Sequence, residues 1–129
     1  GGGGLVCFHA SDNAFPDWAE FNEMIGVGGW GGRDEKSGPK VRWRKGEVVL
    51  DDGPGVAMHP EPFEYTVECC SPEHPIMRGL PEAWLHAIDE QYSQLRGPAK
   101  NLTVLATAIA GPEIENGTGE NEPMLMAIE

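Results

Sequence analysis

Frequent glycines and prolines limit this chain to short secondary-structure elements joined by many turns. The 129 residues include 18 Gly and 11 Pro, and both residue types weaken or interrupt helices and strands. This density argues against a bundle of long helices. The length fits a single domain over residues 1–129, and a chain of this size can bury a working hydrophobic core.

Apolar patterns along the chain predict an α/β order of elements. Residues 5–8 form a short continuous apolar run, which is typical of a strand buried on both faces of a parallel sheet. A helix is expected over residues 16–25, where Gly26 stops it. Residues 82–95 are ambiguous between helix and strand. Further strands, of which the first two form a hairpin, are expected over residues 41–44, 47–50, 63–69, 102–110 and 124–128.

Charge and cysteine content narrow the expected partners and compartment. The net charge is −12, and an acidic surface repels nucleic-acid backbones and anionic membranes alike. No apolar run is long enough to span a bilayer. Cys7, Cys69 and Cys70 form no even disulfide framework, which favours a reducing, cytoplasmic setting. Export is not excluded, because the chain lacks an initial Met and both ends look cut from a longer protein.

His9 is the first candidate functional residue, because it follows the predicted strand at residues 5–8. Ligands in open α/β sheets bind outside the carboxyl ends of strands. Ser11, Asp12 and Asn13 come next, ahead of the predicted helix. In the alternative interpretation His9 holds the turn, and Asp12 or Asn13 simply caps the helix.

A second candidate is Asp89-Glu90-Gln91-Tyr92, with His86 just before it. Two carboxylates beside a tyrosine and a histidine can bind a metal or supply an acid–base pair. On a helix, Asp89 and Glu90 would point about 100° apart, so only one would face a given site. The alternative is a solvated acidic patch with Tyr92 packed beneath it.

The local sequence also gives expectations for Trp30, His74 and His59. Trp30 stands among glycines and is either a core residue or a platform for stacking a sugar ring. His74, beside Pro75, is expected to hold a turn by hydrogen bonding. His59 lies in a Gly/Pro-rich loop and is expected to be exposed.

Several ordered motifs together resemble the ThuA-like (trehalose utilisation) family. The most distinctive are the glycine–strand–histidine motif ending at His9, a His-Pro-Ile loop at His74, and Asp89-Glu90-Gln91-Tyr92, which resembles the Asp-Glu-Leu-Tyr motif of the family. The resemblance runs nearly end to end. The matching segments are residues 2–10, 13–15, 18, 20–26, 29–35, 74–76, 79–81, 89–92, 104–108 and 122–125.

The resemblance implies a class I glutamine amidotransferase-like fold, a flavodoxin-like three-layer α/β/α sandwich that is incomplete at both ends of this chain. The resemblance has no match in this chain for the first strands of the family fold or for its final glycine-rich strand. In that fold the turn after Phe8 is where amidotransferases place a nucleophilic cysteine. Here that position holds His9, and Cys7 lies within the expected strand, so the chain is not expected to be a functional glutamine amidotransferase.

The family association with trehalose and related sugars implies a sugar substrate. His9 and Glu90 are then the expected catalytic residues, acting directly or through a divalent metal such as zinc, and Asn13, Trp30, Asp89 and Tyr92 are expected to bind substrate. Catalysis predicts that His9 and Glu90 converge within about 8 Å. A non-catalytic carbohydrate-binding domain predicts an aromatic groove around Trp30 instead. Homo-oligomerisation is left open.

Overall fold

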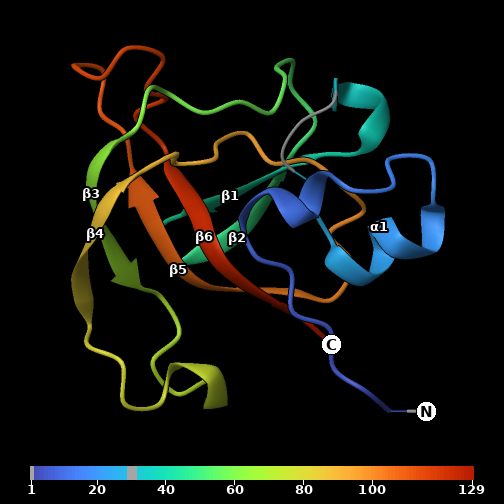
Figure 1. The fold of residues 1–129 in the computed structure, drawn as a ribbon, viewed down its shortest axis with the longest axis horizontal. Helices are drawn as coiled ribbons and strands as arrows, with labels where there is room; N and C mark the ends of the chain where they lie inside the picture. Colours follow the sequence, from blue (N-terminus) through green and yellow to red (C-terminus); the bar gives the residue numbers. More distant parts are fainter. Residues whose placement is uncertain (1, 29–31) are drawn as a thin grey trace.

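The computed structural model describes residues 2–28 and 32–129. Over these residues the protein has one α-helix, three short 3-10 helices and six strands (Figure 1). The fold is therefore mixed α/β, with sheets and few helices. The elements are η1 (His9–Asn13), α1 (Ala19–Ile25), η2 (Glu35–Ser37), β1 (Lys40–Arg44), β2 (Glu47–Asp51), β3 (Phe63–Cys69), η3 (Pro75–Met77), β4 (Ala83–Asp89), β5 (Leu102–Ile109) and β6 (Asn121–Ile128).

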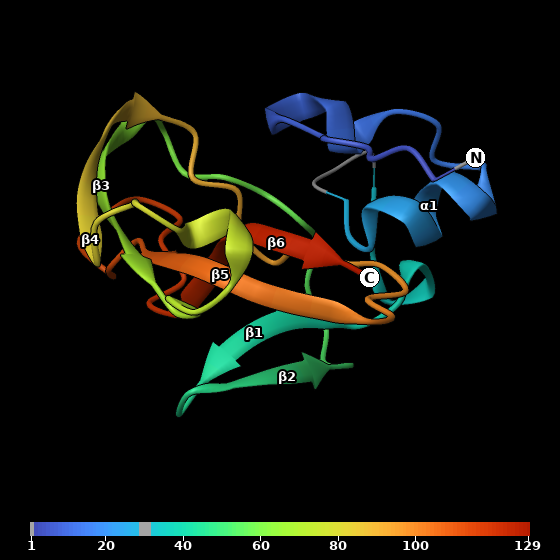
Figure 2. The same cartoon turned by 90° about the horizontal axis from the view of Figure 1, so that it is seen from below.

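The hairpin β1–β2 forms where the sequence predicts it. Arg44 pairs with Glu47, so Lys45 and Gly46 make a two-residue loop, and both have positive φ (55° and 81°). Such a loop matches the right-handed twist of the paired strands. Figure 2 shows β1 and β2 as a separate layer against β5 and β6.

The remaining strands form one antiparallel sheet in the order β4-β3-β5-β6. Tyr65 and Val67 of β3 are buried while their neighbours in the strand are more exposed, which confirms the predicted alternation. The interior strand β5 is buried without a break from Val104 to Ala108. It supplies both hydrophobic clusters, one beneath the β1–β2 hairpin and one beneath β3.

The predicted buried strand at residues 5–8 is wrong for this structure. These residues are extended but belong to no strand, and Val6 and Phe8 are 89% and 81% exposed. Cys7, expected to be buried, is exposed too. Among the described residues, no strand pairs with residues 5–8. All strand pairings among the described residues are antiparallel, so the parallel flavodoxin-like sheet is not seen in this chain.

The helix is shorter than predicted, because Pro16 lies in a turn and α1 begins only at Ala19. Phe21 is its one buried residue. Gly26 ends the helix as expected, with a φ of 75° that residues with a Cβ rarely adopt. A Cβ at Gly26 would also run into the Ile128 side chain, so this glycine lets the end of α1 approach the end of β6.

Candidate functional site

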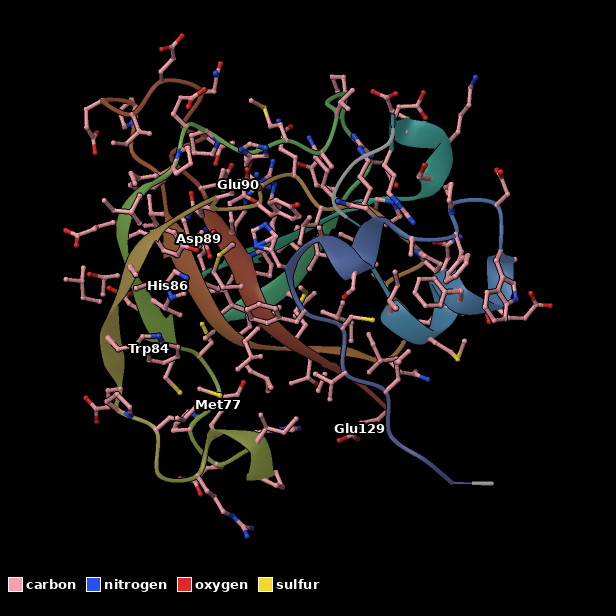
Figure 3. The ribbon with its side chains drawn as sticks, in the orientation of Figure 1. Met77, Trp84, His86, Asp89, Glu90 and Glu129 are labelled. Atoms are coloured by element: carbon pink, nitrogen blue, oxygen red, sulfur yellow. The ribbon has the colours of Figure 1, made fainter. Side chains whose placement is uncertain are left out.

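His9 and Glu90 meet where η1 faces the end of β4. His9 Nε2 donates to Glu90 Oε2 at 3.1 Å, well inside the separation that catalysis requires. His9 Nδ1 also lies 3.9 Å from Asp89 Oδ1. Figure 3 shows His86, Asp89 and Glu90 following one another along β4 and beyond its end. The structure therefore places one imidazole between two adjacent carboxylates that are 81 and 80 residues away in the chain.

Local backbone geometry brings both carboxylates to His9. The sequence suggested that a helix would point Asp89 and Glu90 in different directions. Instead β4 ends at Asp89, and the Asp89 carboxylate accepts a hydrogen bond of 2.9 Å from the Glu90 N–H. The strand pleat, which would separate neighbouring side chains onto opposite faces, no longer applies beyond that point. Both side chains can therefore reach the same imidazole.

Residue 9 is positioned by an unusual backbone turn. His9 has a φ of 49°, a backbone conformation that residues with a Cβ seldom adopt unless the surrounding structure holds them there. Ser11 holds the turn, because its Oγ accepts from the Phe8 N–H at 2.7 Å and donates to the Phe8 carbonyl at 2.9 Å. The chain direction thus changes between the exposed segment 2–8 and η1, and His9 faces β4.

Tyr92 and Asn13 complete the polar cluster that the sequence predicted. The Tyr92 ring lies 4.8 Å from the His9 ring, centre to centre, and Asn13 Nδ2 donates to the Tyr92 hydroxyl at 3.4 Å. Burial raises the pKa of Tyr92, and the hydrogen bond from Asn13 opposes that shift. Trp30, the remaining predicted residue, lies outside the described residues.

Two histidines extend this cluster: His86, which the sequence placed beside Asp89 and Glu90, and His59, which it did not assign to the site. His59 was expected to be exposed, yet its Nε2 lies 3.8 Å from Glu90 Oε1 and its ring stacks on Tyr92 at 5.7 Å. His86 Nε2 donates to Asp89 Oδ2 at 3.1 Å, and this hydrogen bond is the main reason that the pKa of Asp89 is lowered. Imidazoles and carboxylates therefore alternate across the site.

A strand irregularity explains the placement of His86. Asp89 pairs with Phe63 and His86 pairs with Tyr65, so three steps along β4 match two steps along β3. An extra residue of this kind is a β-bulge, which resets the alternation of side chains. His86 and Asp89 can then share one face, although they are an odd number of residues apart. The sequence has no marker of this bulge.

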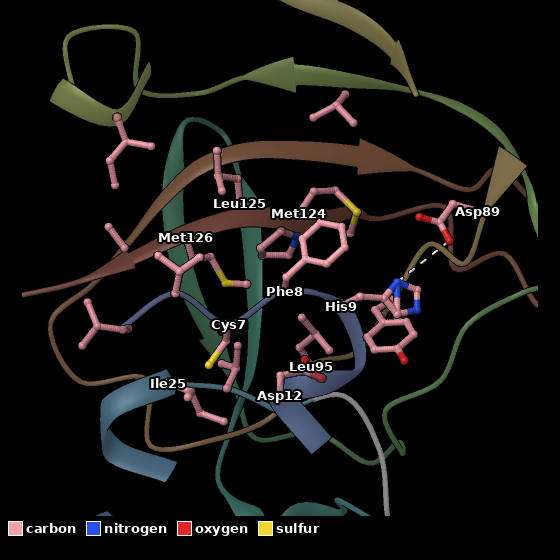
Figure 4. Close-up of a pocket in the computed structure, with 18 of the residues that line it drawn as sticks. Cys7, Phe8, His9, Asp12, Ile25, Asp89, Leu95, Met124, Leu125 and Met126 are labelled. Carbon is pink, nitrogen blue, oxygen red and sulfur yellow. Dashed lines mark ion pairs between the residues drawn. The ribbon is translucent and has the colours of Figure 1, made fainter. Parts of the chain in front are cut away.

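A cavity of about 690 Å³ opens beside the cluster. Its polar end is lined by His9, Asp12, Asp89, Glu90 and Tyr92, and its apolar walls come from residues 5–8 and from β6. Figure 4 shows His9 facing Asp89 at the polar end, with Met124, Leu125 and Met126 along the wall. This volume falls in the usual range for small-molecule sites, which combine apolar walls with a few placed polar groups.

Asp12 differs electrostatically from the other carboxylates of the cavity. Burial raises its pKa from 3.8 to about 6, against the opposing attraction of Arg33 and His9. The same buried surroundings leave Asp12 Oδ1 without a hydrogen-bond partner among the described residues. From its place in the sequence Asp12 was one of the polar residues after His9, with helix capping as the alternative role.

Among the residues that the structure describes, no group of three or more His, Cys, Asp or Glu side chains is arranged to hold a metal ion. No helix in the same part of the chain is long and apolar enough to cross a membrane.

The fold and the cavity define a mixed α/β protein with a polar pocket of small-molecule size. The chain belongs to the ThuA family, since the family model described as trehalose utilisation matches residues 1–128. It is similar to a solved structure from Parabacteroides merdae that is described as ThuA-like, with 43% identity and a TM-score of 0.93. That match covers 99% of this chain but 46% of the other. A search of curated proteins gives no match.

Proposed function

We propose that this chain supplies the acid–base part of a sugar-processing site, in which Glu90 and His9 move protons at a sugar hydroxyl. The observation that carries the proposal is the 3.1 Å contact between His9 Nε2 and Glu90 Oε2 at the polar end of the cavity. The family adds its association with trehalose utilisation. The chain spans less than half of the related solved structure, so the activity of the whole protein is part of the proposal.

Glu90 is the proposed proton acceptor. A sugar hydroxyl within hydrogen-bond reach of its carboxylate would lose its proton to Glu90 as negative charge develops on the substrate. His9 holds the carboxylate in place through Nε2–H, and Asp89, at 3.9 Å from Nδ1, orients the imidazole from its other side. Two carboxylates around one imidazole also stabilise the imidazolium whenever His9 takes up the proton.

The aromatic and amide groups are the proposed sugar contacts. Tyr92 lines the cavity and stacks on His59, and Asn13 is hydrogen-bonded to the Tyr92 hydroxyl. Hydroxyl and amide groups of this kind can donate to or accept from sugar hydroxyls. The apolar wall from β6 suits the C–H face of a pyranose ring.

Substituting the acid–base pair tests this function. In the full-length protein, Glu90→Gln and His9→Ala are each expected to lower turnover of trehalose, or of its 3-keto form, by about 10²–10⁴-fold, because a positioned acid or base is lost. Melting temperatures should stay within a few degrees of wild type. Initial rates and thermal melts on the same samples provide the measurement.

Glu64→Gln is the matched control, since Glu64 is an exposed glutamate on β3 that does not line this cavity. It should keep the wild-type rate. Unchanged turnover in Glu90→Gln would contradict the catalytic proposal. Sugar binding without turnover in the wild type would instead favour a non-catalytic carbohydrate-binding domain.

We expect this chain to retain zinc only weakly if the site uses a divalent metal. His9 and Glu90 supply two ligands, whereas zinc sites in proteins take three or four. Metal analysis after tag-free purification should therefore find well under one zinc per chain. Stoichiometric zinc that survives dialysis would contradict this, and His59→Ala and His86→Ala would then identify additional ligands.

The flavodoxin-like three-layer sandwich is proposed for the longer ThuA architecture. Residues 5–8 are extended and carry exposed apolar side chains, which suits a strand that gains partners in a longer chain. Hydrogen exchange checks this, because the amides of residues 5–8 should exchange slowly in the full-length protein.

A further inference from the structure

We propose that Asp12 is a second acid–base residue of the same cavity, and that it donates a proton to a substrate oxygen while Glu90 accepts one. This inference rests on the proposed function, because it assigns a further role within that site. No motif used in the sequence comparison singles out Asp12.

Asp12 belongs to the same short helix as His9, since they are the first and fourth residues of η1. The two side chains are close enough that the His9 charge favours the Asp12 carboxylate. Both side chains line the same cavity as Glu90 and Tyr92. Figure 4 shows Asp12 and His9 on neighbouring parts of the cavity wall.

The capping role considered for Asp12 is not seen. The residue before η1 is Phe8, and the one before α1 is Trp18, which makes no side-chain cap hydrogen bond. Ser11, not Asp12, hydrogen-bonds to the backbone at the start of η1. Asp12 Oδ1 is buried and has no partner among the described residues. A buried carboxyl oxygen without a partner is costly for the fold, so a role toward a ligand explains it better than a structural role.

Two charged neighbours, Arg33 and His9, act on the Asp12 carboxyl group, and a hydrogen bond from its own backbone also lowers its pKa. Arg33 and His9 favour the carboxylate, but burial outweighs them and raises its pKa to about 6. Tyr92 lies close enough that the Asp12 charge raises its pKa in turn. Asp89, by contrast, has a lowered pKa. The cavity therefore holds one carboxyl group, Asp12, that stays protonated up to about pH 6, and another, Asp89, that is ionised at that pH. A protonated carboxyl group at a substrate cavity can act as a general acid.

The proton balance closes within the site. Glu90 gains the proton of one sugar hydroxyl as that oxygen forms a bond to the reacting carbon. The bond between this carbon and the leaving oxygen breaks, and the leaving oxygen takes the proton of Asp12, whose O–H bond breaks. Asp12 is left as a carboxylate facing Arg33 and His9. One proton then returns from Glu90 to Asp12, through His9 or solvent, before the next turnover. No oxidant, reductant or further reactant is consumed.

Asp12→Asn in the full-length protein is the direct test, because asparagine keeps the shape and has no carboxyl proton to donate. The expected result is a fall in turnover of about 10²-fold or more. The wild-type rate should decline as the pH rises through about 6, where Asp12 loses its proton, and the variant should lack that decline. Asp12→Glu should recover part of the rate. Asp17→Asn, an exposed aspartate of the same segment, should match the wild type.

A second readout is independent of turnover. Carboxyl ¹³C NMR of the wild type should show an aspartate that titrates near pH 6 and disappears in Asp12→Asn. If the resonance assigned to Asp12, the one missing in Asp12→Asn, titrates near pH 4, the proposal is overturned. The proposal is also overturned if the folded Asp12→Asn protein keeps the wild-type rate and pH profile. If Glu90→Gln is inactive in the same assay, the proposed function still stands. If Glu90→Gln is active as well, the proposed function fails first.

Discussion

Glu122→Gln is expected to lower the free energy of unfolding by about 3–5 kcal/mol, the usual cost of breaking a buried ion pair from one side. Glu122 on β6 is fully buried and pairs with the buried Arg42 on β1. Its carboxylate also accepts from the Gln94 N–H at 3.0 Å and from Thr118 Oγ1 at 2.8 Å. Glutamine keeps the volume but removes the negative charge that pairs with Arg42. The other carboxylate near Arg42, Asp51, lies 3.9 Å from its Nε and cannot replace the closer contact. Urea denaturation followed by tryptophan fluorescence measures the change.

Glu120→Gln is the matched control for this prediction. Glu120 lies two residues earlier and pairs with Arg44 of the same strand β1 at 2.5 Å, but both side chains are substantially exposed. Exposed pairs contribute little because water and salt screen them, so the variant should unfold close to wild type. Equal destabilisation by the two substitutions would show that burial of the Arg42–Glu122 pair does not matter.

Arg96→Met is expected to destabilise the protein by a similar amount. Arg96 is fully buried, and its guanidinium donates to the carbonyls of Gly55, Gly38 and Gly53 at 2.8, 2.9 and 2.5 Å. Each buried carbonyl left without a donor costs about 1–3 kcal/mol. Methionine fills much of the space but donates nothing. Chemical denaturation should show the loss, and faster hydrogen exchange in residues 52–55 should locate it.

Arg96→Lys separates charge from geometry. Lysine keeps the charge, but a single ammonium group cannot copy the planar fork of donors that reaches three carbonyls in different directions. We therefore expect its stability to fall between wild type and Arg96→Met. A lysine variant as stable as the wild type would mean that the positive charge, and not the three hydrogen bonds, holds the loops together.

The sequence predicted elements whose signals are local. The hairpin around Lys45-Gly46, the alternation in β3 and the stop at Gly26 all depend on a few neighbouring residues. Of the ambiguous stretch 82–95, only residues 83–89 form a strand, and they do so because β4 pairs with β3. Residues 5–8 had a strong strand signal but no described partner, and a strand needs a partner as well as a pattern.

The candidate site shows the same division. Family motifs pointed to His9 and Glu90, and the structure brings them together, but their catalytic role stays a prediction. The motifs did not point to His59, which reaches Glu90 from a loop 31 residues earlier in the chain. Nor did they point to Asp12, because an exposed cap and a buried cavity carboxyl look the same in a sequence.

The sequence by itself determined the residue types available for chemistry, the turns and the alternation of apolar side chains, since each depends on side chains close together in the chain. Only the tertiary structure decided strand pairing, the bulge that turns His86 toward Asp89 and the burial that raises the pKa of Asp12. Each of these depends on segments far apart in the chain, whose approach is set by the packing of the whole domain.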